Sequence, residues 1–241
     1  MARFYYDFHV HSCLSPCADN DNTPSNIAGM ASVSGLDIVA LTDHNSTKNC
    51  PAFFKVAERF GVIAIAGMEL TTSEDIHVVC LFESLEGALE FENALSKKRI
   101  LIKNRPEIFG EQLVMDADER IVSNEEYLLS NATAISIEEL PPFVNRYGGI
   151  CYPAHIDREA NGIISVLGTF PPTPHFKCAE LHSINNKEAY TKNYALDGKI
   201  ILYGSDAHYL GDIFEREHYV ELDAQRDDPD GVRRALFALL R

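Results

Sequence analysis

Two histidines stand two residues apart near the start of the chain, in the stretch Asp7-Phe8-His9-Val10-His11. The apolar run 4–10 predicts a short strand, and side chains two apart on a strand leave the same face. His9 and His11 can therefore point at one spot, where two neutral imidazoles would make half of a metal site. A His-x-His pair alone is a weak indication, because imidazole also serves as an ordinary hydrogen-bonding side chain.

Further apolar runs carry residues of metal-ligand type at one end. Such residues follow the runs 36–41, 62–66, 150–152 and 200–203, and one precedes the run 78–82. The residues concerned are Asp43, His44, Glu69, His77, His155, Asp206 and His208. Chance does not readily place polar ligand types at so many equivalent positions. The sequence therefore predicts a cluster of histidines and carboxylates, a mixture that suits Zn, Mn or Fe.

The elements between these residues predict the scaffold. Apolar strands alternate with helices at 24–33, 51–60 and 85–96 through short connections, a pattern typical of parallel βα units. Barrel enzymes built from such units have their active sites at the carboxyl ends of the strands. A last amphipathic helix is expected at 228–240, with Val232, Leu236 and Leu239 toward the core.

Residues 99–148 interrupt the alternation. Short apolar stretches at 112–115 and 120–122 predict a β-hairpin, and helices are expected at 125–129 and 136–147. We interpret this region as an insertion that lies over the site or packs beside it. The chain as a whole, residues 1–241, is expected to form a single domain.

Composition limits the partners of the protein. Lys and Arg number 21 and Asp and Glu 36, which gives a formal net charge of −15. Such a chain repels long nucleic acid over most of its surface, whereas a small anionic substrate could be drawn by bound cations. No apolar run reaches the ~20 residues that span a bilayer, and no signal peptide opens the chain. We expect a soluble, cytoplasmic protein without membrane contact.

The six cysteines form no paired framework. Without a secretion signal they are expected to be free thiols. Cys13 and Cys17 follow the histidine pair closely, which makes a soft ligand conceivable. A single C-x-x-x-C pair is, however, a weak indication of zinc.

In combination, these segments resemble the PHP (polymerase and histidinol phosphatase) family of metal-dependent phosphoesterases. They are Asp7-x-His9-x-His11, Thr42-Asp43-His44, Gly67-x-Glu69, His77, Pro153-Ala154-His155 and Ser205-Asp206-Ala207-His208. The resemblance covers nearly the whole chain apart from the insertion. It implies an α/β fold, a distorted seven-stranded βα (TIM-like) barrel, with a cluster of two or three divalent metal ions that is a trinuclear centre when all three sites are filled.

The resemblance also implies which residues hold each ion. The groups are His9, His11, Glu69 and Asp206 for the first ion, Glu69, His77 and His155 for the second, and His44, His208 and Asp19 for the third. The commoner family pattern places an Asp sooner after the second histidine, so the choice between Asp19 and Asp21 stays open. Asp7 and Asp43 neighbour ligands and are expected to orient them as hydrogen-bond acceptors.

The implied activity is the hydrolysis of small phosphate mono- or diesters by a metal-bridging hydroxide. Arg158 could grip a phosphate bidentately, or could be a surface arginine paired with Asp157 or Glu159. His182 could protonate the leaving group or contact substrate, or could be an ordinary buried histidine.

Two other functions are compatible with these residues. One is an amidohydrolase-like activity on C–N bonds, because barrel sites of His and Asp also perform that chemistry. The other is a non-catalytic module that binds metal or nucleotide, since the presence of ligands does not establish turnover.

Overall fold

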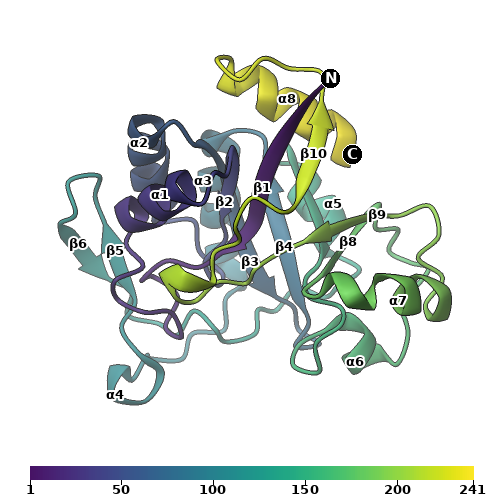
Figure 1. Cartoon of the computed structure of the whole chain (residues 1–241). Coiled ribbons are helices and arrows are strands. Elements are labelled where there is room, and N and C mark those ends of the chain that lie inside the picture. Colours follow the sequence, from purple (N-terminus) through teal and green to yellow (C-terminus); the bar gives the residue numbers. More distant parts are fainter.

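A curled six-stranded mixed sheet forms the centre of the computed structural model, which describes residues 1–241 (Figure 1). Its strand order is β10-β1-β2-β3-β4-β7. The strands are β1 (Ala2–Val10), β2 (Ile38–Leu41), β3 (Ile63–Thr71), β4 (His77–Phe82), β7 (Gly149–Pro153) and β10 (Tyr219–Leu222). A separate parallel pair comprises β8 (Cys178–Leu181) and β9 (Ile200–Tyr203).

The parallel pair continues the curl of the main sheet between β7 and β1. The main-chain N–H of Ile156, just after β7, donates to the carbonyl of Glu180 in β8. On the other side of the pair, Ala207, which follows β9, forms a parallel β-bridge with Val10 at the end of β1. Seven strands thus form the distorted barrel that the family resemblance implies, and β10 is an additional edge strand that the sequence analysis missed.

The direction of β4 differs from the expected parallel arrangement. β3 and β4 pair antiparallel, with Thr71 opposite His77, and β4 and β7 also pair antiparallel. The connection 72–76 is far too short for a parallel crossover, which needs about a dozen residues or more. The prediction of parallel units was therefore wrong here. The reversal explains why His77 is the first residue of its strand, whereas the other ligand candidates lie near the end of a strand or beyond it.

Both faces of the central strands are buried, which explains their continuous apolar sequences. Val39 and Leu41 of β2 belong to one hydrophobic cluster, and Ile38 and Ala40 belong to the other. The helices α1 (Pro24–Val33), α2 (Cys50–Phe60) and α3 (Leu85–Leu95) contribute to the first cluster. α8 (Pro229–Leu240) contributes to the second and lies near the beginning of β1, away from the end that carries the histidines (Figure 1).

The helices agree with expectation in some details and depart from it in others. Thr23 caps α1, as its place before Pro24 implies, by accepting a hydrogen bond from the N–H of Asn26. On α8, Leu239 is 37% exposed, whereas Phe237 and Leu240 are buried. The remaining helices are α4 (Pro106–Phe109), α5 (Leu140–Asn145), α6 (Ile163–Leu167), α7 (Lys187–Asn193) and the short 3-10 turns η1 (Ser96–Lys98), η2 (Ile184–Asn186) and η3 (Leu210–Asp212). None of the helices has the length and apolar character needed to cross a membrane.

The insertion packs beside the first loop of the chain. The predicted hairpin is confirmed as β5 (Leu113–Met115) and β6 (Ile121–Asn124). The prediction of a helix at 125–129 is wrong, because Tyr127 in this segment pairs with Lys103 in an isolated β-bridge. Within the range 136–147, where a longer helix was expected, the structure has a turn followed by the short helix α5.

Contacts with the 12–17 loop and with Asn45 and Asn49 hold the insertion in place. Leu113 donates its N–H to the carbonyl of Cys13, and the Asn49 amide donates to the carbonyl of Leu113. The amide of Asn45 donates to the carbonyls of Leu129 and Asn131.

Candidate metal centre

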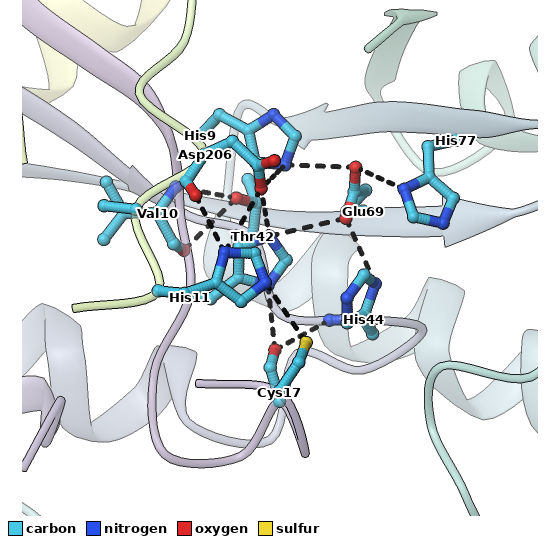
Figure 2. Close-up of polar contacts among 12 residues, drawn as sticks. His9, Val10, His11, Cys17, Thr42, His44, Glu69, His77 and Asp206 are labelled. Atoms are coloured by element: carbon cyan, nitrogen blue, oxygen red, sulfur yellow. Dashed lines mark hydrogen bonds and ion pairs between the residues drawn. The ribbon is translucent and has the colours of Figure 1, made fainter. Parts of the chain in front are cut away.

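Ligand-type side chains from distant parts of the sequence converge at one edge of the curled sheet (Figure 2). They are His9, His11, His44, Glu69, His77, His155, Asp206 and His208. All are buried except His77 and His208, which are partly exposed. The structure therefore brings together eight of the nine residues proposed as metal ligands.

Glu69 lies at the middle of the cluster and is fully buried. Its carboxylate oxygens lie 3.2 Å from His9 Nε2, 3.4 Å from His11 Nε2, 3.1 Å from His44 Nδ1, 2.9 Å from His77 Nδ1 and 3.1 Å from His155 Nε2. Burial alone would raise the pKa of Glu69, but the surrounding imidazoles hold it well below its usual range. One carboxylate thus faces five imidazoles.

Asp206 lies beside the first histidine pair. Its Oδ1 is 3.1 Å from His11 Nε2 and 3.4 Å from His9 Nε2. Asp206 has a φ of +53° and His155 a φ of +25°, a backbone region that non-glycine residues seldom adopt. Such conformations concentrate at functional sites, where the surrounding structure holds them.

These residues form three groups whose ligand atoms lie within 4.8 Å of one another. The groups are His9, His11, Glu69 and Asp206; His44, Glu69 and His77; and His11, His44 and His208. The first matches the ligand set implied for one ion. His44 joins Glu69 and His77 in the second group, where His155 was expected, although His155 also contacts Glu69.

Buried atoms of the cluster lack hydrogen-bond partners. They include His9 Nε2, His11 Nε2, His44 Nδ1, His77 Nδ1, Glu69 Oε2 and Asp206 Oδ1. An unpaired buried polar atom is costly, and so many at one place call for a ligand that accepts their lone pairs. Metal–ligand bonds of about 2.0–2.2 Å put neighbouring ligand atoms ~2.9–3.4 Å apart. The distances around Glu69 fall in this range, so the residues fit divalent metal ions.

Hydrogen bonds from the opposite ring nitrogens orient two of these imidazoles. His9 Nδ1 lies 2.8 Å from Glu180 Oε1, and an ionised carboxylate can only accept, so His9 donates from Nδ1. His11 Nδ1 lies 2.9 Å from Ser15 Oγ, whose own proton goes to Asp43 Oδ1 at 2.7 Å. Both rings therefore carry their proton on Nδ1 and present the lone pair of Nε2 to the cluster, as metal-binding histidines do.

Asp7 ties the strand that bears His9 to the loop that bears Asp206. Its carboxylate accepts from the main-chain N–H groups of His9, Ser205 and Phe214, each at 3.2 Å. Burial raises the pKa of Asp7 to about 6. The hydrogen bonds of Asp7 and Asp43 agree with the expectation that both act as acceptors around the ligands.

Glu180 is a residue that the sequence analysis missed. It is fully buried, binds His9 through Oε1 and also accepts from the main-chain N–H of His155 at 3.0 Å. A Cβ on Gly204 would lie 2.4 Å from Glu180 Oε2, so a side chain there would displace the carboxylate. The available indication was a charged residue in the otherwise apolar stretch 178–181, where a buried charge requires a partner.

The loop carboxylates do not join the cluster. Asp19 Oδ1 accepts from the main-chain N–H of Asp21, and Asp21 is exposed. Neither belongs to a ligand group. Instead, Cys17 Sγ lies 3.1 Å from His208 Nε2. Burial would raise the pKa of Cys17, but hydrogen bonds with His208 and His44 lower it to about 5.

Arg158 and His182 lie together at the open side of the cluster. Arg158 forms an ion pair with Asp206, and its Nη2 lies 3.1 Å from His182 Nδ1. Asp157 is instead occupied by the N–H groups of His182 and Ser183, at 2.8 and 3.0 Å. Arg158 therefore pairs with Asp206 and not with Asp157 or Glu159. His182 is exposed, so it is not an ordinary buried histidine.

A cavity of about 110 Å³ opens over the cluster. Its lining includes Glu69, Arg158, Asp206 and His208. Pockets that enclose a drug-sized ligand measure roughly 300–1,000 Å³. This cavity has room for a small group only, and the rest of a larger molecule would remain outside it.

The sequence matches the model of the PHP domain over residues 7–157, more than half of the chain. The chain therefore belongs to the PHP family, as its motifs imply. An uncharacterized protein of Methanocaldococcus jannaschii is 30% identical over 100 residues, and the match covers 38% of this chain and 58% of that protein.

Solved structures support the fold. The lesion-specific endonuclease Q of Pyrococcus furiosus superposes with a TM-score of 0.66 at 17% identity, covering 99% of this chain and 56% of the endonuclease. A candidate metal-dependent phosphoesterase of Bifidobacterium adolescentis superposes with a TM-score of 0.60 at 17% identity, covering 96% of this chain and 95% of the phosphoesterase. An amidohydrolase of Chromobacterium violaceum superposes with a TM-score of 0.58 at 19% identity, covering 90% of this chain and 91% of the amidohydrolase. The chain thus spans little more than half of the endonuclease and of the archaeal relative.

The contact of Glu180 with His9 yields a test of the site. Glu180→Gln removes the charge that holds the His9 proton on Nδ1, and we expect metal affinity to fall about tenfold or more. Competition with a metal-binding dye would measure the change. Glu188→Gln, on the exposed surface of α7, is the matched control. Equal affinities in a folded Glu180→Gln variant and in the control would show that Glu180 does not support the ligand.

Proposed function

We propose that this chain is a metal-dependent hydrolase of small phosphate mono- or diesters. The observation that carries the proposal is the fully buried carboxylate of Glu69, which faces five imidazoles. Membership of the PHP family agrees with it. Imidazole and carboxylate ligands together suit zinc, manganese or iron.

His9, His11, Glu69 and Asp206 would hold one ion, and Glu69 would share a second with His77 and with His44 or His155. Bound ions of this kind supply an activated water and stabilise charge on phosphoryl oxygens. The protein itself contributes the fixed direction of its ligands. Glu180 and Ser15 hold the rings of His9 and His11, so that no reorganisation of these rings is needed when substrate binds.

Arg158 and His182 are the residues proposed to contact substrate. The guanidinium of Arg158 lies at the rim of the cavity beside Asp206, where a phosphate oxygen could take the place of the carboxylate. Asp157 fixes the main chain of His182, and the exposed imidazole lies next to Arg158. His182 is therefore placed to give a proton to a leaving group outside the cavity.

The size of the cavity supports a small reacting group. About 110 Å³ can hold a phosphoryl group, while the organic part of the ester would lie toward Arg158 and His182. The net charge of −15 disfavours long nucleic acid. The end of a nucleic-acid strand would also present a single phosphate to such a site, and an endonuclease shares this fold.

A substrate panel separates the three functions that the sequence left open. The protein loaded with manganese or zinc would be assayed with p-nitrophenyl phosphate, its bis-ester and a set of amides. We expect hydrolysis of a phosphate ester and none of the amides. Cleavage of amides alone would support the amidohydrolase alternative, and inactivity with full metal content would support a non-catalytic binding module.

The same assay includes a variant that removes a ligand. His9→Ala should lower bound metal and the hydrolysis rate together, because it removes an imidazole from the Glu69 cluster. The exposed His175 supplies the control His175→Ala, which should change neither. An unchanged rate in a His9→Ala protein that has lost its metal would contradict the assigned role.

Another prediction concerns the contact between Arg158 and phosphate. Arg158→Lys keeps the charge but loses the planar pair of donors. The inhibition constant of inorganic phosphate should therefore rise, by up to about tenfold. Metal content should stay the same. The exposed Arg146 gives the control Arg146→Lys. If the inhibition constant for phosphate is unchanged in an active Arg158→Lys protein, Arg158 does not bind the phosphoryl group.

A further inference from the structure

We propose that Cys17 is a metal ligand and that, with His44 and His208, it forms a sulfur–nitrogen subsite for zinc at the open edge of the cluster. The proposal rests on the metal cluster of the proposed function and adds a ligand to it. It replaces the carboxylate of Asp19 or Asp21 that the family resemblance implies for this position.

The positions of the donor atoms carry the proposal. Cys17 Sγ lies 3.1 Å from His208 Nε2. His208 Nδ1 lies 2.8 Å from the carbonyl oxygen of Asp206, which can only accept, so the proton of His208 is on Nδ1 and the lone pair of Nε2 faces the sulfur. The imidazole of His44 also contacts the sulfur. Zinc bonds of ~2.3 Å to sulfur and ~2.0 Å to nitrogen place the two donors ~3.5 Å apart, close to the distance observed.

The histidines around the sulfur also belong to the buried cluster. His11 Nε2 and His44 Nδ1, which lie 3.4 and 3.1 Å from Glu69 Oε2, are buried and lack a hydrogen-bond partner. His11, His44 and His208 also form a group whose ligand atoms lie within 4.8 Å of one another. A single thiol proton can satisfy only one nitrogen, whereas one cation can accept lone pairs from the sulfur and from several nitrogens.

The loop that carries Cys17 is held in place. Ser12 donates to Asp43 through its N–H and its hydroxyl, both at 2.7 Å, and Ala18 donates its N–H to the carbonyl of Ser15. Gly110 of the insertion has a φ of +100°, and a Cβ there would lie 2.0 Å from the carbonyl oxygen of Pro16. The insertion therefore packs directly on the residue before Cys17 and fixes the turn that presents the sulfur.

The chemistry of sulfur determines which metal this subsite prefers. Thiolate is a soft ligand that selects zinc and similar ions, whereas manganese and magnesium prefer oxygen ligands. Cys17 is exposed, while Cys13, Cys50, Cys80 and Cys178 are buried. Cys151 is half-buried, so Cys17 is the most exposed of the six cysteines, and its protection by a metal can be measured.

Cobalt reports directly on a thiolate ligand. The full chain, stripped with a chelator, would be titrated with Co²⁺ and followed by absorption in the near ultraviolet, where a sulfur-to-cobalt charge-transfer band appears. We expect this band in the native protein and its loss in Cys17→Ser. The half-buried Cys151 supplies the control Cys151→Ser, which should retain the band.

Zinc content gives the second readout. Cys17→Ser should bind one zinc ion fewer than the native protein, and Cys17→Asp should regain an ion without the charge-transfer band. Zinc should also slow the alkylation of Cys17 by iodoacetamide, measured by mass spectrometry. A native protein without the band, or a band that persists in Cys17→Ser, would overturn the proposal.

These results are separate from the outcome of the activity assays. A band without ester hydrolysis would support Cys17 as a ligand while contradicting the proposed function. Hydrolysis without a band would support the function and exclude the sulfur ligand.

Discussion

The burial of Glu69 among five imidazoles is the constraint on which the rest of this structure depends. A carboxylate removed from water requires compensating charge or donors, and lone pairs facing lone pairs require a cation between them. The strands that bring these groups together are therefore arranged for a shared ligand. Divalent ions would reverse the local sign of a site that lies in a strongly acidic chain, which makes it attractive to anions.

Hydrogen-bond acceptors around the cluster extend this constraint outward. Glu180 and Asp43, the latter through Ser15, set the direction in which His9 and His11 present their lone pairs. Asp7 joins β1 to the loop of Asp206. The candidate ligands lie at or just beyond strand ends, and the acceptors lie in β1, in β8 and in the adjoining loops, so the geometry of the site is inseparable from the curl of the sheet.

Local sequence patterns were sufficient for much of the fold. Apolar runs with a ligand residue at one end predicted the strands and the residues that converge, because periodicity and the positions of strand ends are local properties. The direction of β4 was not predicted, although the five residues before His77 are too few for a crossover. The helix expected at 125–129 failed because pairing of Tyr127 with Lys103, a tertiary contact, outweighs local propensity.

The residues that sequence reasoning missed or undervalued owe their roles to contacts across the fold. Glu180 reaches His9 across 171 positions of the chain, and Cys17 reaches His208 across 191. Asp19 has the expected chemistry, but its carboxylate is used in a local turn. A suitable residue type near a motif is therefore a weaker guide than the direction in which the loop presents each side chain.

The most direct measurement is anomalous X-ray diffraction from crystals of the zinc- or manganese-loaded protein, recorded at the absorption edge of the metal. The account predicts at least two peaks, each about 2.0–2.3 Å from ligand atoms, with Glu69 bonded to both and His9 and His77 bonded to different ions. A map in which no ion contacts Glu69, although the crystal contains bound metal elsewhere, would contradict the account.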